Sequence, residues 1–300
     1  IIPPIHIRDN LQLRPTEYQV LLKGVKVAGV EILADHYLAM DPGDAVKDIG
    51  GVPTTEPAFN LPALWIPESK KEEAKLAGYT VVDNVAVMAT HLSEVIRSHA
   101  AELIGRQEVQ GLLDHLAKSR PKAVEELVPN LLSLGNVQKV LQNLLREQVS
   151  VRDLLTIVET LADYAPLAKD PDLLTEYVRH KLARSIIGPH LAEDGTLRVI
   201  TLTQEVEDVL ANGVQNTDYG AYLSISPHQA DAVVGSVKEQ AEKAMARNIQ
   251  PVVLTGPTIR RHLKKMVEYF LPNLVVLSQS ELPGDTRIQS IGEVRWNHAG

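Results

Sequence analysis

The segment of residues 56–67 constrains the fold more than any other stretch, because prolines recur in it at five-residue spacing. Each proline fixes its own φ angle and lacks an N–H donor, so no helix runs through the segment. The sequence therefore predicts a loop followed by a short extended stretch over residues 63–66. The chain has 2 Phe and 2 Trp residues, and one of each, Phe59 and Trp65, lies here.

Two interpretations of this proline-spaced segment remain open. Aromatic side chains carry the largest apolar area per residue, so their concentration here indicates that the segment packs against something. The first interpretation, which the residues alone favour, is a strand beside a buried loop. The second is that Phe59 and Leu61 line an apolar depression on the surface, where a side chain of a partner protein docks. The burial of Phe59 distinguishes the two.

Composition excludes several classes of protein. At 300 residues the chain is long enough for two or more domains, and its 44% hydrophobic and 23% charged residues are typical of soluble globular proteins. The absence of cysteine excludes disulfides, thiolate metal sites and a cysteine nucleophile, and it fits a reducing compartment. The net charge of -8 argues against a general nucleic-acid binder, because the phosphate backbone would be repelled.

The sequence contains no membrane helix and no signal peptide. No run approaches the roughly eighteen apolar residues that a membrane-spanning helix needs. The chain begins without an initiator methionine, at Ile1. We therefore expect it to be a fragment of a longer protein, in which any membrane anchor would precede Ile1.

The first third of the chain predicts two small modules. Strand-like runs occupy residues 5–7 and 18–27, with a turn or bulge at Gly24. A short charged helix over residues 68–76, followed by a strand over residues 79–82, suggests an α+β insert spanning residues 35–83. After it, Asp83 is placed to cap a long helix over residues 84–104.

The middle third predicts a compact helical domain, roughly residues 106–185. Proline at the first helical position and aspartate before it mark two of the helix starts, at Pro121 and at Asp170. A capping box beginning at Ser150 is predicted to open the helix that follows it. Apolar spacing and these signals place helices over residues 107–118, from 121 onward, 136–146, 154–164 and 171–187.

The last third alternates between buried strands and amphipathic helices. Such alternation predicts an α/β sheet with at least one right-handed crossover. The expected strands cover residues 197–202, 251–254, 274–277 and 287–294, the last as an edge strand, and the expected helices cover 228–247 and 258–270. We therefore predict an α+β multidomain protein whose C-terminal part is α/β.

No catalytic constellation is visible in the sequence. Nucleotide-binding glycine loops, zinc-protease motifs and nucleophile elbows are absent, and His91 and His99 lie eight residues apart on one predicted helix. At that separation they do not share a metal directly, so we expect them at the surface or the core edge. We predict no catalytic residue, metal or cofactor. Two classes survive: a protein-interaction module, and an enzyme whose active site is assembled from dispersed residues.

One candidate anion site is present. A strand, a glycine turn and a helix N-terminus combine at residues 254–257, before a basic helix that begins near Arg260. Pro257 removes one of the donors, and a basic run more often marks a solvated face or a protein contact. We therefore expect one of those roles for the basic helix rather than anion binding.

Short motifs spread along nearly the whole chain carry a resemblance to a known family. In chain order they occupy residues 5–10 (IHIRDN), 56–59 (EPAF), 63–66 (ALWI), 90–92 (THL), 105–108 (GRQE), 127–129 (LVP), 139–145 (KVLQNLL), 152–153 (RD), 159–163 (ETLAD), 170–171 (DP) and 274–278 (LVVLS). In these motifs the chain resembles the cytoplasmic domain of the FlhA family (FHIPEP), the flagellar type III export gate proteins. The injectisome proteins InvA and LcrD are related to this family, and the PAF motif and the long helical motifs favour the flagellar branch.

The resemblance implies four subdomains. The first comprises residues 1–34 and 84–105, and the second, residues 35–83, is inserted into it. The third, residues 106–185, is helical, and the fourth, residues 186–300, is α/β. The resemblance also implies a missing N-terminal membrane half and a place at the cytoplasmic face of the bacterial inner membrane.

The resemblance further implies partners and a binding site, with the same role if the chain is instead an injectisome-type homologue. In the family this domain forms a nonameric ring, docks export chaperones with their bound substrates, and works with other soluble export components such as the ATPase complex. Docking uses an apolar dimple between the first two subdomains. Carried over by motif, the dimple comprises Glu56 at the rim, Phe59, Leu61, Val82, Val87 and Thr90, with Met40 and Pro42 nearby.

This chain departs from the family pattern at two positions close to Phe59. Members usually carry aspartate where this chain has Glu56, and glycine where it has Asn60. The acid is kept but is one methylene longer. Asparagine tolerates a left-handed backbone better than most residues, so we expect the loop to follow the same path.

Overall fold

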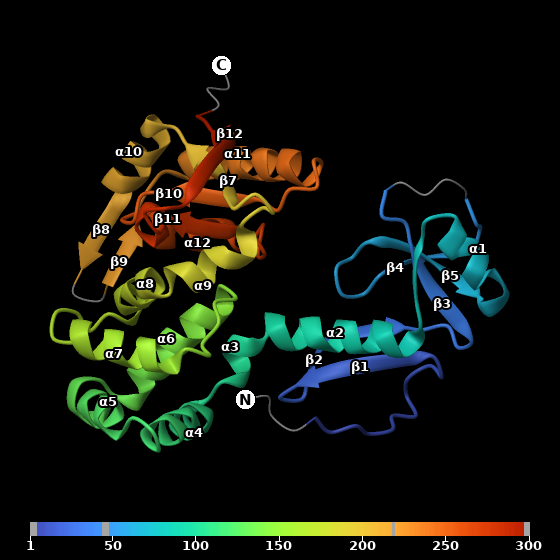
Figure 1. Cartoon of the computed structure of the whole chain (residues 1–300), viewed down its shortest axis with the longest axis horizontal. Helices are drawn as coiled ribbons and strands as arrows, with labels where there is room; N and C mark the ends of the chain where they lie inside the picture. The colour runs from blue at the N-terminus through green and yellow to red at the C-terminus, as the bar shows by residue number, and fades with distance from the viewer. Residues whose placement is uncertain (1–4, 44–47, 218–219, 297–300) are drawn as a thin grey trace. The chain divides into compact units, whose positions relative to one another are not determined.

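The chain forms two compact units, residues 1–103 and residues 104–300. The computed structural model in Figure 1 describes residues 5–43, 48–217 and 220–296. Each unit mixes helices and strands, and the expectation of a multidomain α+β protein is confirmed. The finer division into four subdomains stays a prediction.

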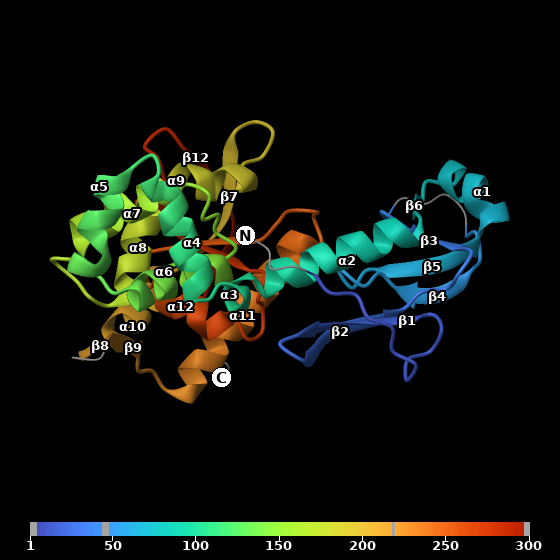
Figure 2. The ribbon, with the colours of Figure 1, turned by 90° about the horizontal axis from the view of Figure 1, so that it is seen from below.

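The first unit contains a four-stranded antiparallel sheet in the order β4-β5-β3-β6, which is seen in Figure 2. Its strands are β3 (His36–Met40), β4 (Val52–Thr55), β5 (Pro62–Pro67) and β6 (Thr80–Val82). Side chains alternate between the two faces of a strand. One face places Leu38 and Trp65 against Val87, and the other places Ala39 and Ile66 against Ala74. The sheet is therefore covered on both faces.

Two helical elements pack on this sheet. Helix α2 (Asn84–Ser98) supplies Val87 to one face, and α1 (Lys71–Leu76), preceded by the 3-10 turn η1 (Glu68–Lys70), supplies Ala74 to the other. The predicted cap of α2 is confirmed, because the Asp83 side chain accepts from the Ala86 N–H at 2.7 Å. The predicted continuous helix to residue 104 is wrong: it ends at Ser98, and α3 (Ala100–Leu103) follows.

A two-stranded hairpin completes the first unit, formed by β1 (Glu17–Leu22) and β2 (Val25–Glu31). The predicted turn at Gly24 is confirmed. Gly24 has φ +84 and Lys23 has φ +51, both in the left-handed region that two-residue hairpin turns require. The predicted strand over residues 5–7 is wrong, since this stretch is irregular and Ile7 is 93% exposed.

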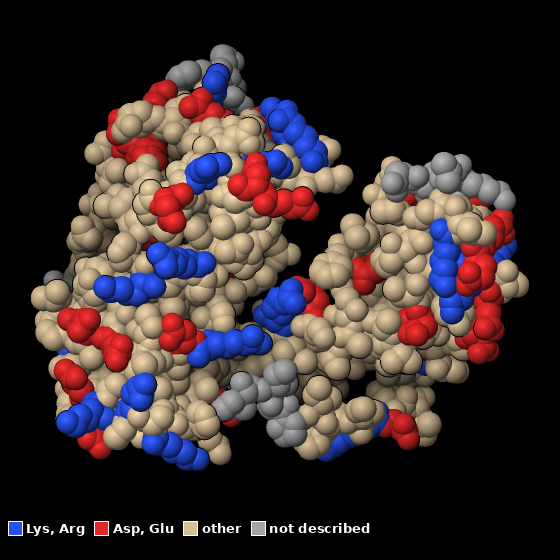
Figure 3. Space-filling view, viewed as in Figure 1, with Lys and Arg blue, Asp and Glu red and all other residues tan. Residues whose placement is uncertain are grey.

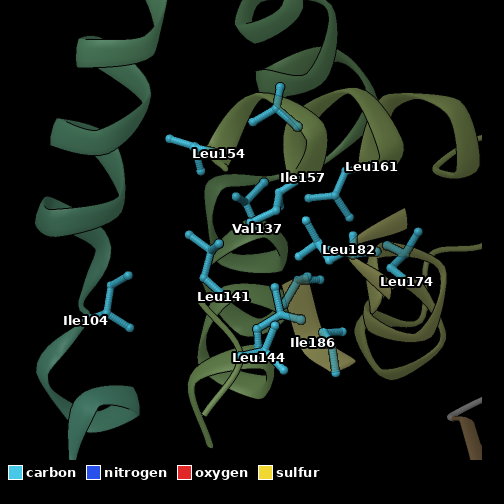
Figure 4. Close-up of a cluster of buried hydrophobic side chains, with 14 of the residues drawn as sticks. Ile104, Val137, Leu141, Leu144, Leu154, Ile157, Leu161, Leu174, Leu182 and Ile186 are labelled. Atoms are coloured by element: carbon cyan, nitrogen blue, oxygen red, sulfur yellow. The ribbon is translucent and has the colours of Figure 1, made fainter. Parts of the chain in front are cut away.

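The second unit begins with a layer of helices around an apolar core. Facing side chains from several helices meet in this core, as Figure 4 shows for Leu141, Ile157 and Leu174. The elements are α4 (Arg106–Ala117), α5 (Pro121–Glu125), the π-type turn η2 (Glu126–Leu131), α6 (Leu134–Arg146), α7 (Leu154–Tyr164), α8 (Pro171–Lys181), α9 (Ala183–Ile187) and the 3-10 turn η3 (Gly188–His190).

The starts of these helices test the capping predictions. Asp170 caps α8 as predicted, with its side chain accepting from the Asp172 N–H at 3.0 Å. The predicted capping box at Ser150 is wrong, because Asp153 is the N-cap of α7 and accepts from the Thr156 N–H at 3.2 Å. The short side chain of aspartate reaches the free N–H groups of the first turn from its own position.

A parallel sheet in the order β11-β10-β7-β12 forms the rest of the second unit. Its strands are β7 (Thr196–Leu202), β10 (Val252–Thr255), β11 (Val275–Ser278) and β12 (Arg287–Val294), and the predicted edge position of β12 is confirmed. The associated helical elements are α11 (Pro227–Met245), α12 (Arg260–Val267) and the 3-10 turn η4 (Gln279–Glu281). The sequence missed α10 (Gln204–Gly213) and the hairpin of β8 (Val214–Thr217) and β9 (Gly220–Leu223).

A buried cluster of charged side chains joins the helical layer to this sheet. Arg260 of α12, 1% exposed, donates to Glu147 at the end of α6 and to Glu176 of α8, both at 2.6 Å. Arg179 of α8, 2% exposed, contacts Glu147 at 3.1 Å and pairs with Glu281 of η4 at 2.7 Å. Buried charges persist only when they are paired, so these contacts fix the two layers to each other.

Candidate docking site

A short loop between β4 and β5, residues 56–61, is held in one shape by the buried carboxylate of Glu56, which is 4% exposed. This carboxylate accepts from the Ala58 N–H at 2.9 Å and from the Phe59 N–H at 2.6 Å. The Glu56 backbone N–H donates to the Leu61 carbonyl at 2.8 Å, and the Asn60 N–H donates to the Glu56 carbonyl at 2.9 Å. The docking loop, as we call residues 56–61, is therefore closed by its own hydrogen bonds.

The apolar side chains of the docking loop point to solvent. Phe59 is 57% exposed and Leu61 is 50% exposed, whereas Trp65 in the following strand is 4% exposed. The interpretation of a strand beside a buried loop is therefore right for the strand and wrong for Phe59. Of the two aromatic residues in the proline-spaced segment, Trp65 is buried in the core and Phe59 is exposed.

The other residues assigned to the dimple differ in their exposure. Met40 and Val82 are half-buried at the edge of the cluster that contains Val87. Thr90 and Pro42 are exposed. At the end of β3, Met40 pairs with Ala63, two residues after Leu61, and Val82 pairs with Leu38 of the same strand.

Two of the assigned residues act from inside the protein. Val87 is 2% exposed and packs in the core, so it supports the surface from behind and offers no contact area of its own. Glu56 was assigned to the rim, and its side chain is buried, 4% exposed. Its carboxylate accepts hydrogen bonds from two loop amides and so holds the shape of the loop.

A half-buried contact that the sequence did not reveal lies in the same unit. The Tyr18 hydroxyl of β1 and the His91 Nδ1 of α2 are 2.6 Å apart, and the two rings meet edge to face at 5.8 Å. Burial raises the pKa of Tyr18 to about 12, with a further contribution from the Glu56 charge. Burial lowers the pKa of His91, and the Glu56 charge opposes this. The expectation of His91 at the core edge is met, since it is 6% exposed.

A separate concavity of about 240 Å³ lies on the opposite face of the small sheet, the face that packs against α1. It is lined by Ala39, Asp41, Pro53, Thr54, Pro62, Ala63, Leu64 and Tyr79. Burial raises the pKa of Tyr79, with contributions from Asp41 and Asp48. A single tyrosine of raised pKa supplies neither a nucleophile nor a general base near neutral pH.

The candidate anion site at the start of the basic helix is occupied by the side-chain carboxylate of Glu207. The Gly256 N–H and the Thr255 hydroxyl donate to the same Glu207 oxygen, at 3.0 and 3.1 Å. Of the two roles expected for the basic helix, a solvated face or a protein contact, the solvated face is wrong for Arg260 and Lys264, which are buried. Arg260 is buried among carboxylates, and Arg261 pairs with Asp170 at 3.1 Å.

Charged residues are unevenly distributed over the visible face of the first unit. Figure 3 shows its charged residues gathered over α1, while much of the remaining visible face of the sheet module is uncharged. In the described parts of the chain, no three His, Asp or Glu side chains are grouped to hold a metal ion. Within those same parts, no helix combines the length and the apolarity that crossing a bilayer takes.

Comparison with known proteins identifies the family of this chain. The sequence model of the FHIPEP family matches residues 1–287. The chain belongs to the FHIPEP family. The flagellar biosynthesis protein FlhA of Bacillus subtilis is 48% identical over 98% of this chain and 43% of its own length, and FlhA of Escherichia coli is 40% identical over 96% and 41%. The chain thus spans about two fifths of the length of these relatives.

Solved structures of similar proteins share the fold. The Chlamydia pneumoniae CdsV protein superposes with a TM-score of 0.88 at 28% identity, covering 98% of this chain and 85% of that one. The nonameric SctV-C of EPEC superposes with a TM-score of 0.79 at 29% identity, covering 98% and 88%. The multidomain α+β fold is therefore that of the FHIPEP cytoplasmic domains.

The two departures from the FHIPEP pattern are both accommodated in the docking loop. Asn60, at the usual glycine position, has φ +57, the left-handed conformation that asparagine tolerates. Glu56, at the usual aspartate position, reaches two loop amides with its longer side chain. The loop keeps a defined shape with both substitutions in place.

Proposed function

We propose that this chain is the cytoplasmic docking platform of a flagellar type III export apparatus. It binds export chaperones with their bound substrates through a docking surface, defined as Phe59, Leu61, Met40, Val82 and Thr90, and so orders their export. One observation carries this proposal: an exposed phenylalanine and an exposed leucine stand on a loop whose backbone is already fixed by a buried carboxylate.

An exposed aromatic ring on a rigid loop is suited to protein recognition. Interfaces concentrate their binding energy in a few aromatic anchors near the centre of the contact. A preorganised backbone avoids the loss of loop entropy on binding. The partner side of such a contact is often the apolar face of a helix, which suits chaperones that present helices. The exposed apolar side chains of Phe59 and Leu61 favour this mode over charge recognition.

The flagellar assignment follows from the relatives, which at 35–48% identity are flagellar biosynthesis proteins. The type III secretion proteins CdsV, SctV-C, InvA and MxiA, which have solved structures, are 22–29% identical. An injectisome-type homologue with the same role is the alternative within the family. We propose that the whole protein lies at the cytoplasmic face of the bacterial inner membrane, anchored by segments outside residues 1–300.

A homo-oligomeric ring is part of this proposal. The SctV-C relative of EPEC is described as nonameric, and the Chlamydia CdsV relative is described in complex with CdsO. Both relatives share the fold of this chain over 98% of its length. We infer that this chain also assembles with copies of itself and meets other soluble export components, such as the ATPase complex.

A role without catalysis agrees with the chemistry of the charged groups. In the described residues, the strongly perturbed carboxylate Glu147 is enclosed by arginines inside the second unit. Such a group stabilises the fold and does not meet a substrate. An enzyme with a dispersed active site is the second candidate, and among the described residues no grouping of side chains favours it over docking.

The test compares the two phenylalanines of the chain, because Phe59 and Phe270 are both 57% exposed. A purified flagellar chaperone–substrate complex is titrated against the fragment by calorimetry. We expect Phe59→Ala to abolish binding and Phe270→Ala to leave it unchanged. Equal binding by both variants and the unaltered chain would refute the docking role, as would a Phe59→Ala chain that no longer folds.

A further inference from the structure

The docking loop reverses the direction of the chain between β4 and β5. The Asn60 N–H donates to the Glu56 carbonyl at 2.9 Å, and the Glu56 N–H donates to the Leu61 carbonyl at 2.8 Å. Next to these bonds, Thr55 pairs with Pro62 at the ends of the two strands. The residues between Glu56 and Leu61 must therefore turn the backbone back on itself.

Asn60 completes this turn with a left-handed backbone. In the docking loop, whose residues are all described, Asn60 alone has a positive φ, +57. A residue in this conformation ends many single helical turns and hairpin loops, because it redirects the chain sharply. For most residues it brings Cβ too close to the following carbonyl oxygen, and asparagine is one of the few that adopt it readily.

Asn60 also stands between the two exposed apolar residues of the loop. On one side, the Phe59 N–H is held by the Glu56 carboxylate at 2.6 Å. On the other side, the Leu61 carbonyl is held by the Glu56 N–H at 2.8 Å. A rotation about φ of Asn60 turns one of these anchored residues relative to the other. The backbone of Asn60 thus sets how the Phe59 and Leu61 side chains are presented together.

We propose that Asn60 is a positioning residue of the docking loop: its left-handed backbone holds Phe59 and Leu61 in the arrangement that a partner binds. The inference rests on the proposed docking function. Asn60 acts through its backbone conformation, so glycine, which adopts a positive φ without strain, can replace it. A β-branched residue cannot, because it is strongly disfavoured at positive φ.

The strands that flank the loop cannot take up the change. A shift of their pairing by one residue would turn every side chain of β5 to the other face of the sheet. Trp65 of β5 is 4% exposed and packs with Leu38 and Val87, so this shift would take it out of the core. A residue at position 60 that resists positive φ therefore opens the loop and displaces Phe59, while β5 stays in place.

The second unit supplies a matched control. Asn248, which follows α11, has φ +55, and its N–H donates to the Met245 carbonyl at 2.9 Å. Valine meets the same local strain at either asparagine. Asn248→Val therefore reproduces the backbone strain of Asn60→Val at a site outside the docking loop, and Asn60→Gly is the variant that should restore the loop.

The scarcity of phenylalanine makes the loop easy to observe. With ¹⁵N-phenylalanine labelling the chain gives two amide signals, one from Phe59 and one from Phe270 as an internal reference. The Phe59 amide donates to Glu56 at 2.6 Å, so its hydrogen-exchange rate reports whether the loop is closed. The asparagine variants leave the number of phenylalanines unchanged, so their spectra are compared directly.

We expect Asn60→Val to accelerate exchange of the Phe59 amide about tenfold, because the cost of a left-handed valine favours the open loop by about that factor. Binding of the flagellar chaperone–substrate complex is expected to weaken by about the same factor. Asn60→Gly should stay within about threefold of the unaltered chain in both measurements. Asn248→Val should lower the thermal stability of the chain but leave the Phe59 amide and the binding unchanged.

The outcomes separate this inference from the docking proposal. An unchanged Phe59 amide in Asn60→Val overturns the positioning role, and so does an Asn60→Gly chain that is perturbed as much as Asn60→Val. Undiminished binding by Asn60→Val, beside lost binding by Phe59→Ala, also overturns it. A perturbed amide in Asn60→Val that Asn60→Gly restores, combined with undiminished binding by Phe59→Ala, supports the control of the loop by Asn60 and refutes the docking role. If Asn60→Val does not fold, Asn60→Ala, which meets a milder form of the same strain, decides the question in the same way.

Discussion

Replacing Glu147 by glutamine tests how much the buried charge cluster stabilises the second unit. The side chain is 16% exposed and contacts both Arg260 and Arg179. Burial alone would raise the pKa of Glu147, but the attraction of Arg179 and Arg260 outweighs it and lowers the pKa from 4.5 to about 2. At about 1.4 kcal/mol per pH unit, this difference corresponds to about 3 kcal/mol of folding stability.

The pH dependence gives this prediction its sign. A carboxylate whose pKa is lower in the folded state contributes its full stability above the unfolded value, near 4.5. That contribution falls as the pH is lowered from 4.5 and is gone at about 2. We therefore expect Glu147→Gln to lower the free energy of unfolding by about 3 kcal/mol at pH 7. Near pH 2 the variant and the unaltered chain should differ little.

The assay uses the tryptophans as separate reporters. Trp65 lies in the first unit and Trp296 packs at the edge of the core in the second. Urea unfolding is followed by Trp296 fluorescence in a Trp65→Phe background at pH 7 and at pH 3. The control is Glu125→Gln, which changes an exposed glutamate of the same helical layer. Equal destabilisation by both glutamine variants, or an acid sensitivity that Glu147→Gln retains in full, would refute the reasoning.

Three further substitutions test local features. Phe59→Ala should lower the unfolding free energy by less than about 1 kcal/mol, because the ring is exposed, and a loss of about 3–5 kcal/mol in calorimetry would instead mark it as a core residue. Asp83→Ala removes the cap of α2 and should lower that free energy by about 1 kcal/mol in urea titrations, whereas Asp83→Asn should retain most of it. Glu207→Ala leaves the Gly256 amide without its acceptor, so that amide should exchange faster in hydrogen-exchange measurements, and unchanged exchange would show that Glu207 does not hold the turn.

Local signals in the sequence predicted much of the fold. Asp170 and Pro121 mark helix starts because capping and proline geometry depend only on adjacent residues. Gly24 marks a turn for the same reason. The sequence did not predict strand β4, because it contains Pro53 and a proline in an edge strand is typical of a loop.

The candidate site could be predicted only in part. The aromatic content of the proline-spaced segment indicated Phe59 and Leu61, but their exposure depends on how the loop closes. Glu56 holds the loop through amides only two and three residues away, so this contact is local. The Tyr18–His91 contact comes from tertiary packing, since the two residues are 73 positions apart, and it leaves no short motif in the sequence.

The basic helix shows why charge patterns mislead. Its sequence, RRHLKK, is typical of a surface facing water or an acidic partner. Its acidic partners belong to the chain itself, and Glu147 is 113 residues from Arg260. A run of basic residues does not reveal the acidic residues that pair with it when these belong to a distant segment of the chain.

The charge cluster around Arg260 also determines which parts of the protein can exist separately. Four elements, α6, α8, α12 and η4, share its ion pairs. Cutting the chain near residue 186, the predicted subdomain boundary, would remove at least one ion-pair partner from each of the three carboxylates and two guanidinium groups of this cluster. The ion pairs therefore hold the helical layer and the parallel sheet of residues 104–300 together.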